Sequence, residues 1–389
     1  MSVIALCLAM GWDEKHKADS GGDRIIINFA KRWLMKGVDV TFITTHMGQK
    51  HLEFYGIRPQ AIHAYPPRGK SGIFIELMKL ISGFYFALRY RPSAFPIIYS
   101  SSNFLSDILP GLMLKMRWKE KITWVVGFWM FPPNPVSAQS PYKGLSWMLR
   151  GFLYYVNAQI PFLLYHGLVD GFFVTNGLDK QELVNKHGID PSRILVVRGG
   201  VDAGACMPPK EKRYDTVFVG RFHPQKGVQL LVDIWKKVCE KRPAAKLAMI
   251  GDGPLYDQVK KRVEMLSLQN NIELLGFMDG ADKMRIFAES KVFVHPVIYD
   301  SGGMAPAEAM VCGLPLVTTD LPSIREYYPM GCLRVQPGSV KAFASTILRL
   351  LDDEELYERL SREAKAYCET WDWREKAEEA YVFLRVLAK

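Results

Sequence analysis

The sequence predicts an α/β protein with two parallel sheets, each covered by helices on both faces. Three observations support this fold. The chain has 389 residues and is 49% apolar, which is enough to bury two cores of ordinary domain size. Short apolar runs alternate with longer amphipathic segments, as they do in parallel sheets with helical crossovers. The second half repeats the alternation of the first, so we expect two domains.

The first half begins with a predicted buried strand at residues 3–10 and a helix at residues 22–35, which Gly37 ends. One face of this helix carries apolar residues at helical spacing: Ile25, Ile26, Phe29, Ala30, Trp33 and Leu34. Further strands, with helices between them, are predicted at residues 38–44, 96–100, 122–126, 171–175 and 194–197.

The second half predicts strands at residues 215–219, 246–250, 272–275, 292–295, 316–318 and 333–335. A last helix is predicted at residues 373–387, after a break at residues 370–373. We expect an N-terminal domain of residues 1–200 and a C-terminal domain of residues 201–370.

Residues 300–313, DSGGMAPAEAMVCG, place two carboxylates eight positions apart, Asp300 and Glu308, where a glycine loop opens a helix. Pro306 suits the first helical turn and Gly313 suits the helix end. Unpaired amides at the positive end of the helix dipole then form an anion site: those of Gly303, Met304 and Ala305. Glu308 is placed to accept two hydrogen bonds from a ribose. Taken alone, the pattern fits an ordinary loop-to-helix junction equally well.

A second segment, residues 216–227 (TVFVGRFHPQKG), strengthens the case for an anion site. It predicts a buried strand that ends at Gly220, followed by Arg221, a turn, and Lys226 at the start of a helix. Both cations follow the carboxyl end of a strand, where open α/β sheets bind ligands. A guanidinium offers a planar fork to phosphate oxygens, and an ammonium offers a point charge.

With these two segments in place, the chain resembles the family-4 retaining glycosyltransferases, which have the type-B fold (GT-B) of two Rossmann-like domains facing across a cleft. Residues 18–45 are similar to the amino-terminal glycine loop, helix and second strand of that family. Residues 199–202 are similar to the entry of its interdomain linker, and residues 250–254 and 275–277 to later strand ends. The family normally has two glutamates where this chain has Asp300 and Glu308.

The resemblance implies a helix at the C-terminal end, residues 371–389, that crosses back onto the N-terminal domain. It implies retention at the anomeric carbon of a sugar taken from a nucleotide-diphosphate donor, with Arg221, Lys226 and Asp300 as catalytic residues. It places the following residues, together with Glu308, in contact with substrate: Gly21, Gly22, Gly220, Phe277, Met278, Gly302, Gly303, Met304 and Ala305. No Asp-x-Asp triplet occurs in the sequence, so we expect no metal and no cofactor.

One residue that the family often carries near the acceptor is missing. The family places a histidine after the fourth amino-terminal strand, where this chain has Phe128 or Trp129. Among the histidines of this chain, His16 and His46 fall near predicted strand ends, where a solvated loop is the better explanation. His295 ends a strand beside Asp300 and is the stronger candidate for a site residue.

The net charge of +10 lies wholly in the first half, where residues 1–200 hold 23 basic and 13 acidic residues. Residues 58–150 hold 12 cations and three acids, mixed with Trp and Phe. This mixture suits a surface that touches anionic lipid. No apolar window reaches the length of a bilayer span, because residues 72–88 contain Glu76 and Lys79.

We therefore expect a peripheral protein on the cytoplasmic face of the membrane, with a lipid-linked acceptor. Reversing the charge of four basic residues should then reduce membrane binding without unfolding the protein: Lys115, Arg117, Lys119 and Lys121.

The six cysteines show neither a CxxC pair nor metal-ligand spacing, so we expect reduced, packed thiols and a cytoplasmic protein. The first residues predict a strand rather than a signal peptide.

Other classes of protein stay open to different degrees. An NAD-dependent enzyme lacks its GxGxxG motif after the first strand, and no nucleic-acid-binding signature accompanies the basic residues. A sugar-nucleotide epimerase and a phosphorylase share the two-domain architecture, although no pyridoxal lysine site is evident. A non-catalytic subunit that binds nucleotide sugars is the remaining alternative.

Overall fold

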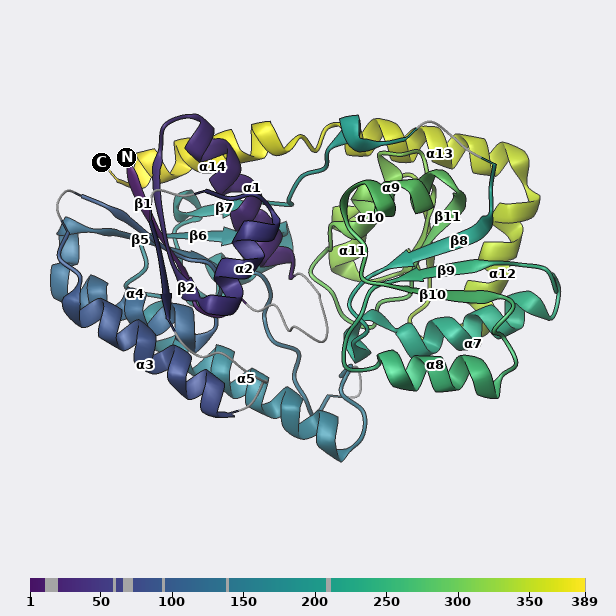
Figure 1. Cartoon of the computed structure of the whole chain (residues 1–389), viewed down its shortest axis with the longest axis horizontal. Helices are drawn as coiled ribbons and strands as arrows, with labels where there is room; N and C mark the ends of the chain where they lie inside the picture. Colours follow the sequence, from purple (N-terminus) through teal and green to yellow (C-terminus); the bar gives the residue numbers. More distant parts are fainter. Residues whose placement is uncertain are drawn as a thin grey trace.

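A computed structural model describes residues 1–10, 20–58, 61–65, 73–92, 95–137, 140–207 and 211–388. These residues form two parallel sheets, one from each half of the chain, which lie side by side along the long axis of the molecule (Figure 1).

The N-terminal sheet has the strand order β3-β2-β1-β4-β5-β6-β7. Its strands are β1 (Ser2–Cys7), β2 (Asp39–Thr45), β3 (Ala61–Tyr65), β4 (Ile97–Ser100), β5 (Thr123–Gly127), β6 (Gly171–Val174) and β7 (Ile194–Val196). Strands β4 and β6 are buried along their whole length. Helices cover both faces of this sheet, and parallel strands covered in this way are nearly continuous apolar runs.

The helices of the N-terminal half divide between the two faces of its sheet. They are α1 (Gly21–Met35), α2 (His46–Phe54), α3 (Ile73–Arg89), α4 (Leu105–Trp118), α5 (Leu145–Tyr165) and α6 (Gly177–His187). The core on one face contains buried residues of α1, such as Phe29 and Trp33. The core on the other face contains residues of α3, α4 and α5, among them Phe86, Leu114 and Phe162.

The C-terminal sheet has the order β10-β9-β8-β11-β12-β13. Its strands are β8 (Tyr214–Val219), β9 (Leu247–Ile250), β10 (Ile272–Gly276), β11 (Ser290–His295), β12 (Leu316–Thr319) and β13 (Cys332–Val335). The accompanying helices are α7 (Val228–Cys239), α8 (Tyr256–Met265), α9 (Gly280–Ala288), α10 (Ala305–Met310), α11 (Pro322–Tyr327), α12 (Val340–Asp352) and α13 (Glu354–Glu369). The C-terminal sheet therefore has the doubly wound order 3-2-1-4-5-6, and the N-terminal sheet has the same order with β7 added at its edge. The direction of winding changes between β1 and β4 and between β8 and β11.

The last helix, α14 (Trp373–Leu387), returns to the N-terminal half, where Figure 1 shows it beside α1. Its buried residues Trp373, Ala377 and Leu384 belong to the core that α1 covers. The indole of Trp33 in α1 donates a hydrogen bond to the carbonyl of Ala377, with a distance of 2.9 Å. The predicted α/β fold and its returning helix are confirmed, whereas the domain boundaries at residues 200 and 371 stay predictions.

The predicted strands all appear, with ends that differ by up to three residues, but the prediction contained no strand at β3. This strand lies at the edge of the N-terminal sheet and pairs only with β2 among the described residues. The sequence of β3, AIHAY, lacks the continuous apolar run that marked the buried strands. An edge strand needs no such run, because one of its sides has no neighbouring strand.

The expectation of six reduced cysteines is wrong for one pair, because Cys206 and Cys312 form a disulfide. The two residues are 106 positions apart in the sequence, so their spacing gives no signal. The fold brings the turn after Asp202 against the end of α10, with 5.4 Å between the two Cα atoms. The cysteines therefore do not support a reducing compartment.

Candidate active site

The predicted site residues follow β8 and β11, the two strands between which the C-terminal sheet changes direction. Their loops leave the same edge of the sheet, because parallel strands end on the same side. In open α/β sheets, this is the edge at which ligands bind. The segment after β8 contains Arg221 and Lys226, and the segment after β11 contains Asp300 and the glycine loop.

The structure brings Lys226 and Asp300 together as an ion pair between the Lys226 Nζ and the Asp300 Oδ2. Lys226 ends a 3₁₀ turn (Pro224–Lys226), and Gly227 follows it with a φ of 65°. A Cβ at Gly227 would lie 2.0 Å from the carbonyl oxygen of Pro296, so the turn admits only glycine. The chain after β8 is thus held tightly against the chain after β11.

His295 approaches the same carboxylate oxygen of Asp300, with its Nε2 3.7 Å from the Asp300 Oδ2. Its Nδ1 is 3.3 Å from the Thr318 hydroxyl of β12, and the amide of Gly302 is 3.4 Å from the Asp300 Oδ1. Only 7% of the Asp300 side chain is exposed. We call Lys226, His295, Asp300, Gly302 and Gly303 the Asp300 cluster.

Burial and charge fix the protonation states of this cluster. Burial would raise the pKa of Asp300, but the ammonium of Lys226 and the neighbouring His295 bring that pKa below its ordinary value. Burial lowers the pKa of His295 to about 3, although Asp300 opposes the shift. At neutral pH the cluster therefore holds an ionised carboxylate, a neutral imidazole and a nearby ammonium.

A second group of charges surrounds Glu308 and joins the two halves of the molecule. The Glu308 Oε1 lies 3.1 Å from the Arg24 Nη2, and its Oε2 lies 2.8 Å from the Lys283 Nζ. The same two cations bind Asp279, at 3.0 Å for Arg24 and 2.7 Å for Lys283. The hydroxyl of Tyr55 donates a further hydrogen bond of 2.8 Å to Asp279. We call these five residues the Glu308 cluster.

Arg24 and Tyr55 belong to α1 and to the residue after α2, whereas Asp279, Lys283 and Glu308 belong to the C-terminal half. The Glu308 cluster is therefore an ionic contact between the two domains. Burial would raise the pKa of Asp279, but Arg24 and Lys283 together lower it well below its ordinary value. The Lys283 side chain is only 3% exposed, so its two carboxylate partners are needed to compensate its buried charge.

The glycine loop between the two clusters is shaped by close packing. Gly302 has a φ of 154°, and a Cβ there would lie 2.3 Å from the ring of Tyr327. Gly303 has a φ of 86°, and its Cβ position lies 3.4 Å from the Asp300 carboxylate. The carbonyl of Gly303 accepts a hydrogen bond from the Tyr328 hydroxyl. Both glycines thus allow the backbone to pass close to buried side chains.

The predicted anion site at the start of α10 has a weaker dipole than we expected. Within the described part of the chain, no hydrogen bond is made by the predicted amide donors of Gly303, Met304 and Ala305. However, α10 contains only six residues, and the dipole of so short a helix is small. An anion at this place would depend mainly on the side-chain cations.

Met304 occupies a different place from the one its predicted role suggested. Its side chain is 8% exposed and packs in the core of the N-terminal half, beside Trp373. A Cβ at Gly199 would lie 2.3 Å from the Met304 Sδ, so only glycine at that position leaves room for the sulfur. Met304 therefore contributes its backbone to the loop and its side chain to the contact between the domains.

The glycines of α1 differ from one another in their surroundings. Gly22 is buried, and a Cβ there would lie 2.3 Å from the Trp129 Nε1, so its small size serves packing against an indole. Among the described residues, only the Met304 Cε lies within 4.0 Å of the position that a Cβ at Gly21 would take. The residues that precede them, 11–19, lie outside the described part of the chain and include His16.

The remaining predicted residues follow two strands of the C-terminal sheet, β8 and β10. Arg221 is exposed, directly after Gly220, whose amide donates to the carbonyl of Ile250. Phe277 and Met278 follow β10, and Met278 packs at the edge of the core under α9.

The structure gives no substitute for the missing histidine among the nearby residues that it describes. Phe128 is fully buried in the core beneath α5. The indole of Trp129 donates a 2.6 Å hydrogen bond to the carbonyl of Ser101. His46 begins α2, capped by Thr45, and His295 belongs to the Asp300 cluster instead.

Sequence reasoning missed Arg24, Tyr55, Asp279 and Lys283. Asp279 and Lys283 are four positions apart at the start of a helix, a spacing that brings two side chains to one face. The sequence contained that signal. Arg24 and Tyr55 reach the cluster from residues more than two hundred positions away, and only the tertiary fold brings them there.

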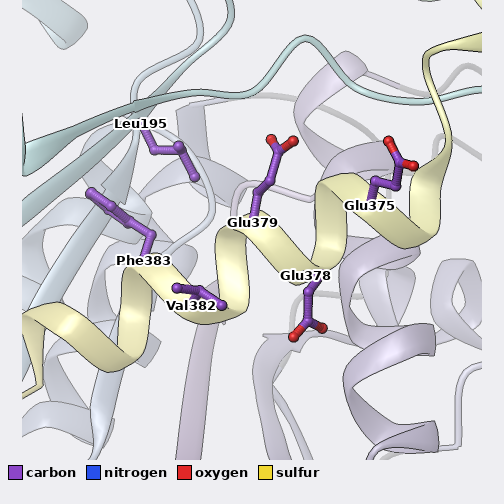
Figure 2. A pocket seen from close by; sticks show the side chains of 6 residues that line it. All are labelled: Leu195, Glu375, Glu378, Glu379, Val382 and Phe383. Atoms are coloured by element: carbon purple, nitrogen blue, oxygen red, sulfur yellow. The ribbon is translucent and has the colours of Figure 1, made fainter.

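Two surface hollows lie away from these clusters. One, of about 700 Å³, is lined by α14 and β7; Figure 2 shows Glu378 pointing to the opposite side from Glu375 and Glu379, so the carboxylates do not converge. The other, of about 890 Å³, lies between the ends of α1 and α14 and has several basic side chains. Within the described ranges, no group of three or more His, Cys, Asp or Glu residues has the arrangement of a metal site.

Comparison with known proteins agrees with this geometry. Residues 207–367 match the family model described as glycosyl transferases group 1. The sulfoquinovosyl transferase SQD2 of Arabidopsis thaliana is 26% identical over 365 residues, which cover 89% of this chain and 67% of that protein. The gpi3 subunit of the phosphatidylinositol N-acetylglucosaminyltransferase of Schizosaccharomyces pombe is 23% identical over 210 residues, which cover 52% of this chain and 46% of the subunit.

Solved structures share the fold over nearly the whole chain. Anabaena HepE, in complex with UDP and glucose, has a TM-score of 0.71 at 16% identity and covers 98% of this chain and 99% of its own. WaaG, a glycosyltransferase involved in lipopolysaccharide biosynthesis, has a TM-score of 0.71 at 14% identity, with coverages of 97% and 98%. The C-terminal half of the chain therefore matches the group 1 glycosyl transferases, and the chain as a whole has the two-domain GT-B fold.

Proposed function

We propose that this enzyme transfers a sugar, with retention and without a metal, from a nucleotide-diphosphate sugar to a lipid-linked acceptor at the cytoplasmic face of a membrane. The observation that carries the donor half of the proposal is the Lys226–Asp300 pair at the switch point of the C-terminal sheet, with Glu308 on the helix that follows. Two solved neighbours support it, since one holds UDP with glucose and another holds UDP with N-acetylglucosamine.

Glu308 keeps the capacity to bind a ribose while it holds its two cations. A carboxylate has about four lone-pair sites, and Arg24 and Lys283 occupy one on each oxygen. The two remaining sites accept the two ribose hydroxyls. In this arrangement the two cations fix the orientation of the Glu308 carboxylate.

The departing diphosphate is stabilised by Arg221 and Lys226. The bond between the anomeric carbon and the phosphate oxygen breaks, and the acceptor oxygen forms its bond on the same face of the sugar. The acceptor proton passes to a phosphate oxygen. As negative charge develops on the diphosphate, the Lys226 ammonium turns from Asp300 toward it. This cation then stabilises the transition state electrostatically.

The acceptor half of the proposal rests on charge and on the names of relatives. The first 200 residues hold the whole net charge of +10, and basic residues there stand beside aromatic rings, as Arg117 does with Trp118 at 5.0 Å. Two curated relatives are named for phosphatidylinositol, a membrane lipid. An anionic membrane attracts such a surface.

The test has two stages. Purified protein is first heated with a panel of nucleotide sugars, and we expect one base and sugar to raise the melting temperature. That donor is then incubated in EDTA with extracted membrane lipid, and we expect sugar to appear in the lipid fraction. Stabilisation without transfer or donor hydrolysis would indicate a binding subunit. Transfer that EDTA abolishes would contradict the metal-free mechanism.

A further inference from the structure

Helix α3 presents an apolar stripe to solvent. The side chains that point away from the core recur at spacings of three and four residues: Phe74, Leu77, Ile81, Phe84 and Leu88. All five are among the exposed large hydrophobic residues, and Phe74 is 70% exposed. The buried side of the same helix contains Ser82, Gly83, Phe86 and Ala87. A helix on the surface of a globular protein normally has its polar face outward.

Helix α5 repeats this inversion over 21 residues. Its exposed side chains are Leu145, Met148, Leu149, Phe152, Leu153, Ile160, Leu163 and Leu164, of which Leu145 is 86% exposed. Its buried side contains Ala158, Pro161, Phe162 and Tyr165. No Asp or Glu occurs between the ends of this helix, and Arg150 is its only charged residue.

The two stripes face the same way. Helices α3, α4 and α5 all pack on one side of the N-terminal sheet, in one core. Figure 1 shows α3 and α5 running along that side of the domain. Helix α4 lies between α3 and α5, and the ring of Phe104 at its start lies 5.8 Å from that of Tyr154 in α5. We call the exposed apolar residues of α3 and α5 together the α3–α5 face.

A face of this kind needs an occupant, because contiguous apolar surface on a globular protein marks a contact with a protein or a membrane. The charges around the α3–α5 face indicate which of these two partners it contacts. Its single acid, Glu76, is paired with Lys79 at 2.8 Å, whereas Arg89 lies over Tyr85 at 4.3 Å and Arg150 over Trp147 at 5.2 Å. A second copy would set these cations against each other, whereas an anionic bilayer complements them.

We propose that the α3–α5 face inserts its apolar side chains into the interface of an anionic bilayer, with both helices lying in the membrane plane. This deepens the proposed function and rests on it, because it assigns residues to the membrane contact through which a lipid-linked acceptor would be reached. Within the described residues, neither helix combines the length and apolar content that crossing a bilayer requires. The mode is therefore interfacial, with apolar burial added to electrostatic attraction.

The structure also shows that the basic residues of α4 are poor probes of membrane contact. Lys115 is paired with Asp170 at 2.7 Å and donates to the carbonyl of Ile122, and Arg117 donates to the carbonyl of Leu88. Reversing these charges would also break contacts within the domain, so the reversal described above does not isolate membrane binding. The exposed apolar residues of α5 can be changed without breaking such contacts.

The experiment is flotation of the purified protein with vesicles of phosphatidylcholine, with and without phosphatidylglycerol, at low and at high salt. The test variants are Leu149→Glu with Leu164→Glu on α5, and Phe74→Glu with Ile81→Glu on α3. The matched control is Met265→Glu with Val386→Glu, two exposed apolar residues of α8 and α14, helices that do not contribute to the core beneath α3 and α5. Both test variants should lose at least tenfold in binding to anionic vesicles, and the control should bind as wild type does.

Wild-type binding should fall with salt but keep a salt-resistant part, because apolar burial is not screened. Stabilisation by the donor nucleotide should be equal in all variants, which separates this proposal from the donor site. Unchanged vesicle binding in both test variants would overturn the proposal. So would a wild-type dimer, by light scattering, that the test variants dissociate in the absence of any vesicle binding.

Discussion

Helices α5 and α13 each pack one face against a sheet. The residues on their outer faces differ completely. The outer face of α13 carries ion pairs at i, i+4 spacing: Glu358 with Arg362, Arg359 with Glu363, and Lys365 with Glu369. The outer face of α5 carries leucine, phenylalanine and isoleucine. Helical periodicity is present in both and says only that one face is buried. The chemistry of the outer face distinguishes the two helices, and it is the basis of the proposed lipid contact of α5.

The same contrast separates the two domains at their functional edges. The edge of the C-terminal domain where we propose that the donor binds is a set of charges matched in pairs, such as Lys226 with Asp300 and Lys283 with Glu308. The N-terminal domain buries a carboxylate without a cation, because Asp107 accepts hydrogen bonds only from the Ala9 amide and the hydroxyls of Ser101 and Ser102 among described residues. We therefore expect the paired charges of the C-terminal domain to affect turnover. The unpaired carboxylate of Asp107 in the N-terminal domain should instead affect stability.

The largest effect should come from Lys226→Ala. This change removes the cation that neutralises the departing diphosphate, and we expect turnover to fall at least tenfold, about 1.4 kcal/mol of barrier. Steady-state kinetics with the identified donor would measure it. Lys226→Arg keeps the charge and should recover part of the rate. Unchanged turnover in a folded alanine variant would show that Lys226 has no catalytic role. It would also contradict the expectation that the paired charges of the C-terminal domain matter for turnover.

In the N-terminal domain, Asp107→Asn should change how stability depends on pH. Burial raises the pKa of Asp107 to about 7 from its ordinary value of 3.8. The folded protein therefore holds a proton that the unfolded chain has lost, so the contribution of Asp107 to stability falls as pH rises through this window and is constant above it. The amide that replaces the carboxyl group in the variant cannot titrate.

Urea unfolding of both proteins between pH 4 and pH 8 checks this. The free energy of unfolding of the variant minus that of wild type should rise with pH by at most about 1.4 kcal/mol per pH unit. The difference should stop rising near neutral pH. Parallel curves would show that Asp107 ionises normally despite its burial.

Glu308→Gln should weaken donor binding by about fivefold, roughly 1 kcal/mol, because charge-assisted hydrogen bonds are about twice as strong as neutral ones. The size and shape of the side chain are kept. Titration with the nucleoside diphosphate alone would measure the change. Equal affinity in wild type and variant would mean that Glu308 only links Arg24 and Lys283 and does not contact the ribose.

The smallest effect should come from Arg24→Ala, which removes the ionic link between the domains and leaves Lys283 to hold Glu308. Arg24 is 23% exposed, so its pairs are partly screened, and we expect donor affinity to fall about two- to threefold, roughly 0.5 kcal/mol. Lys31→Ala, an exposed cation of the same helix, is the control and should change nothing. A larger loss than that of Glu308→Gln would show that domain contact, rather than the ribose contact, dominates donor binding.

The sequence predicted the sheets because buried parallel strands leave a local signature, as in β4 and β6. It also predicted the Lys226–Asp300 neighbourhood, because Arg221, Lys226 and Asp300 each follow a predicted strand and strand ends share an edge. It could not predict the Glu308 cluster, because Arg24 reaches Glu308 across 284 positions. The Cys206–Cys312 disulfide and the packing of Met304 against Gly199 could not be predicted for the same reason, because each joins residues far apart in the sequence.

The outward stripes of α3 and α5 were readable as periodic patterns, but periodicity does not say which side of a helix faces the sheet. In α3, small residues such as Ser82, Gly83 and Ala87 lie inward, and the larger Phe84 and Leu88 lie outward. A rule that buries the largest apolar residues would have turned this helix around. The difference is physical, because a Cβ at Gly83 would lie only 3.0 Å from the Leu8 side chain and 3.1 Å from Pro110, so a small residue packs best on this side of the helix.

The position of α14 has a consequence for how the protein is made. The face of α1 that contains Trp33 is closed by Ala377 and its neighbours, and the ribosome synthesises these only after the entire C-terminal sheet. Domains usually fold in the order in which they emerge. Here the domain that is made first must wait, with an open apolar groove along α1, while the second domain can already complete its own core. During that interval a chaperone has a defined place to bind, and the nascent chain is most exposed to aggregation.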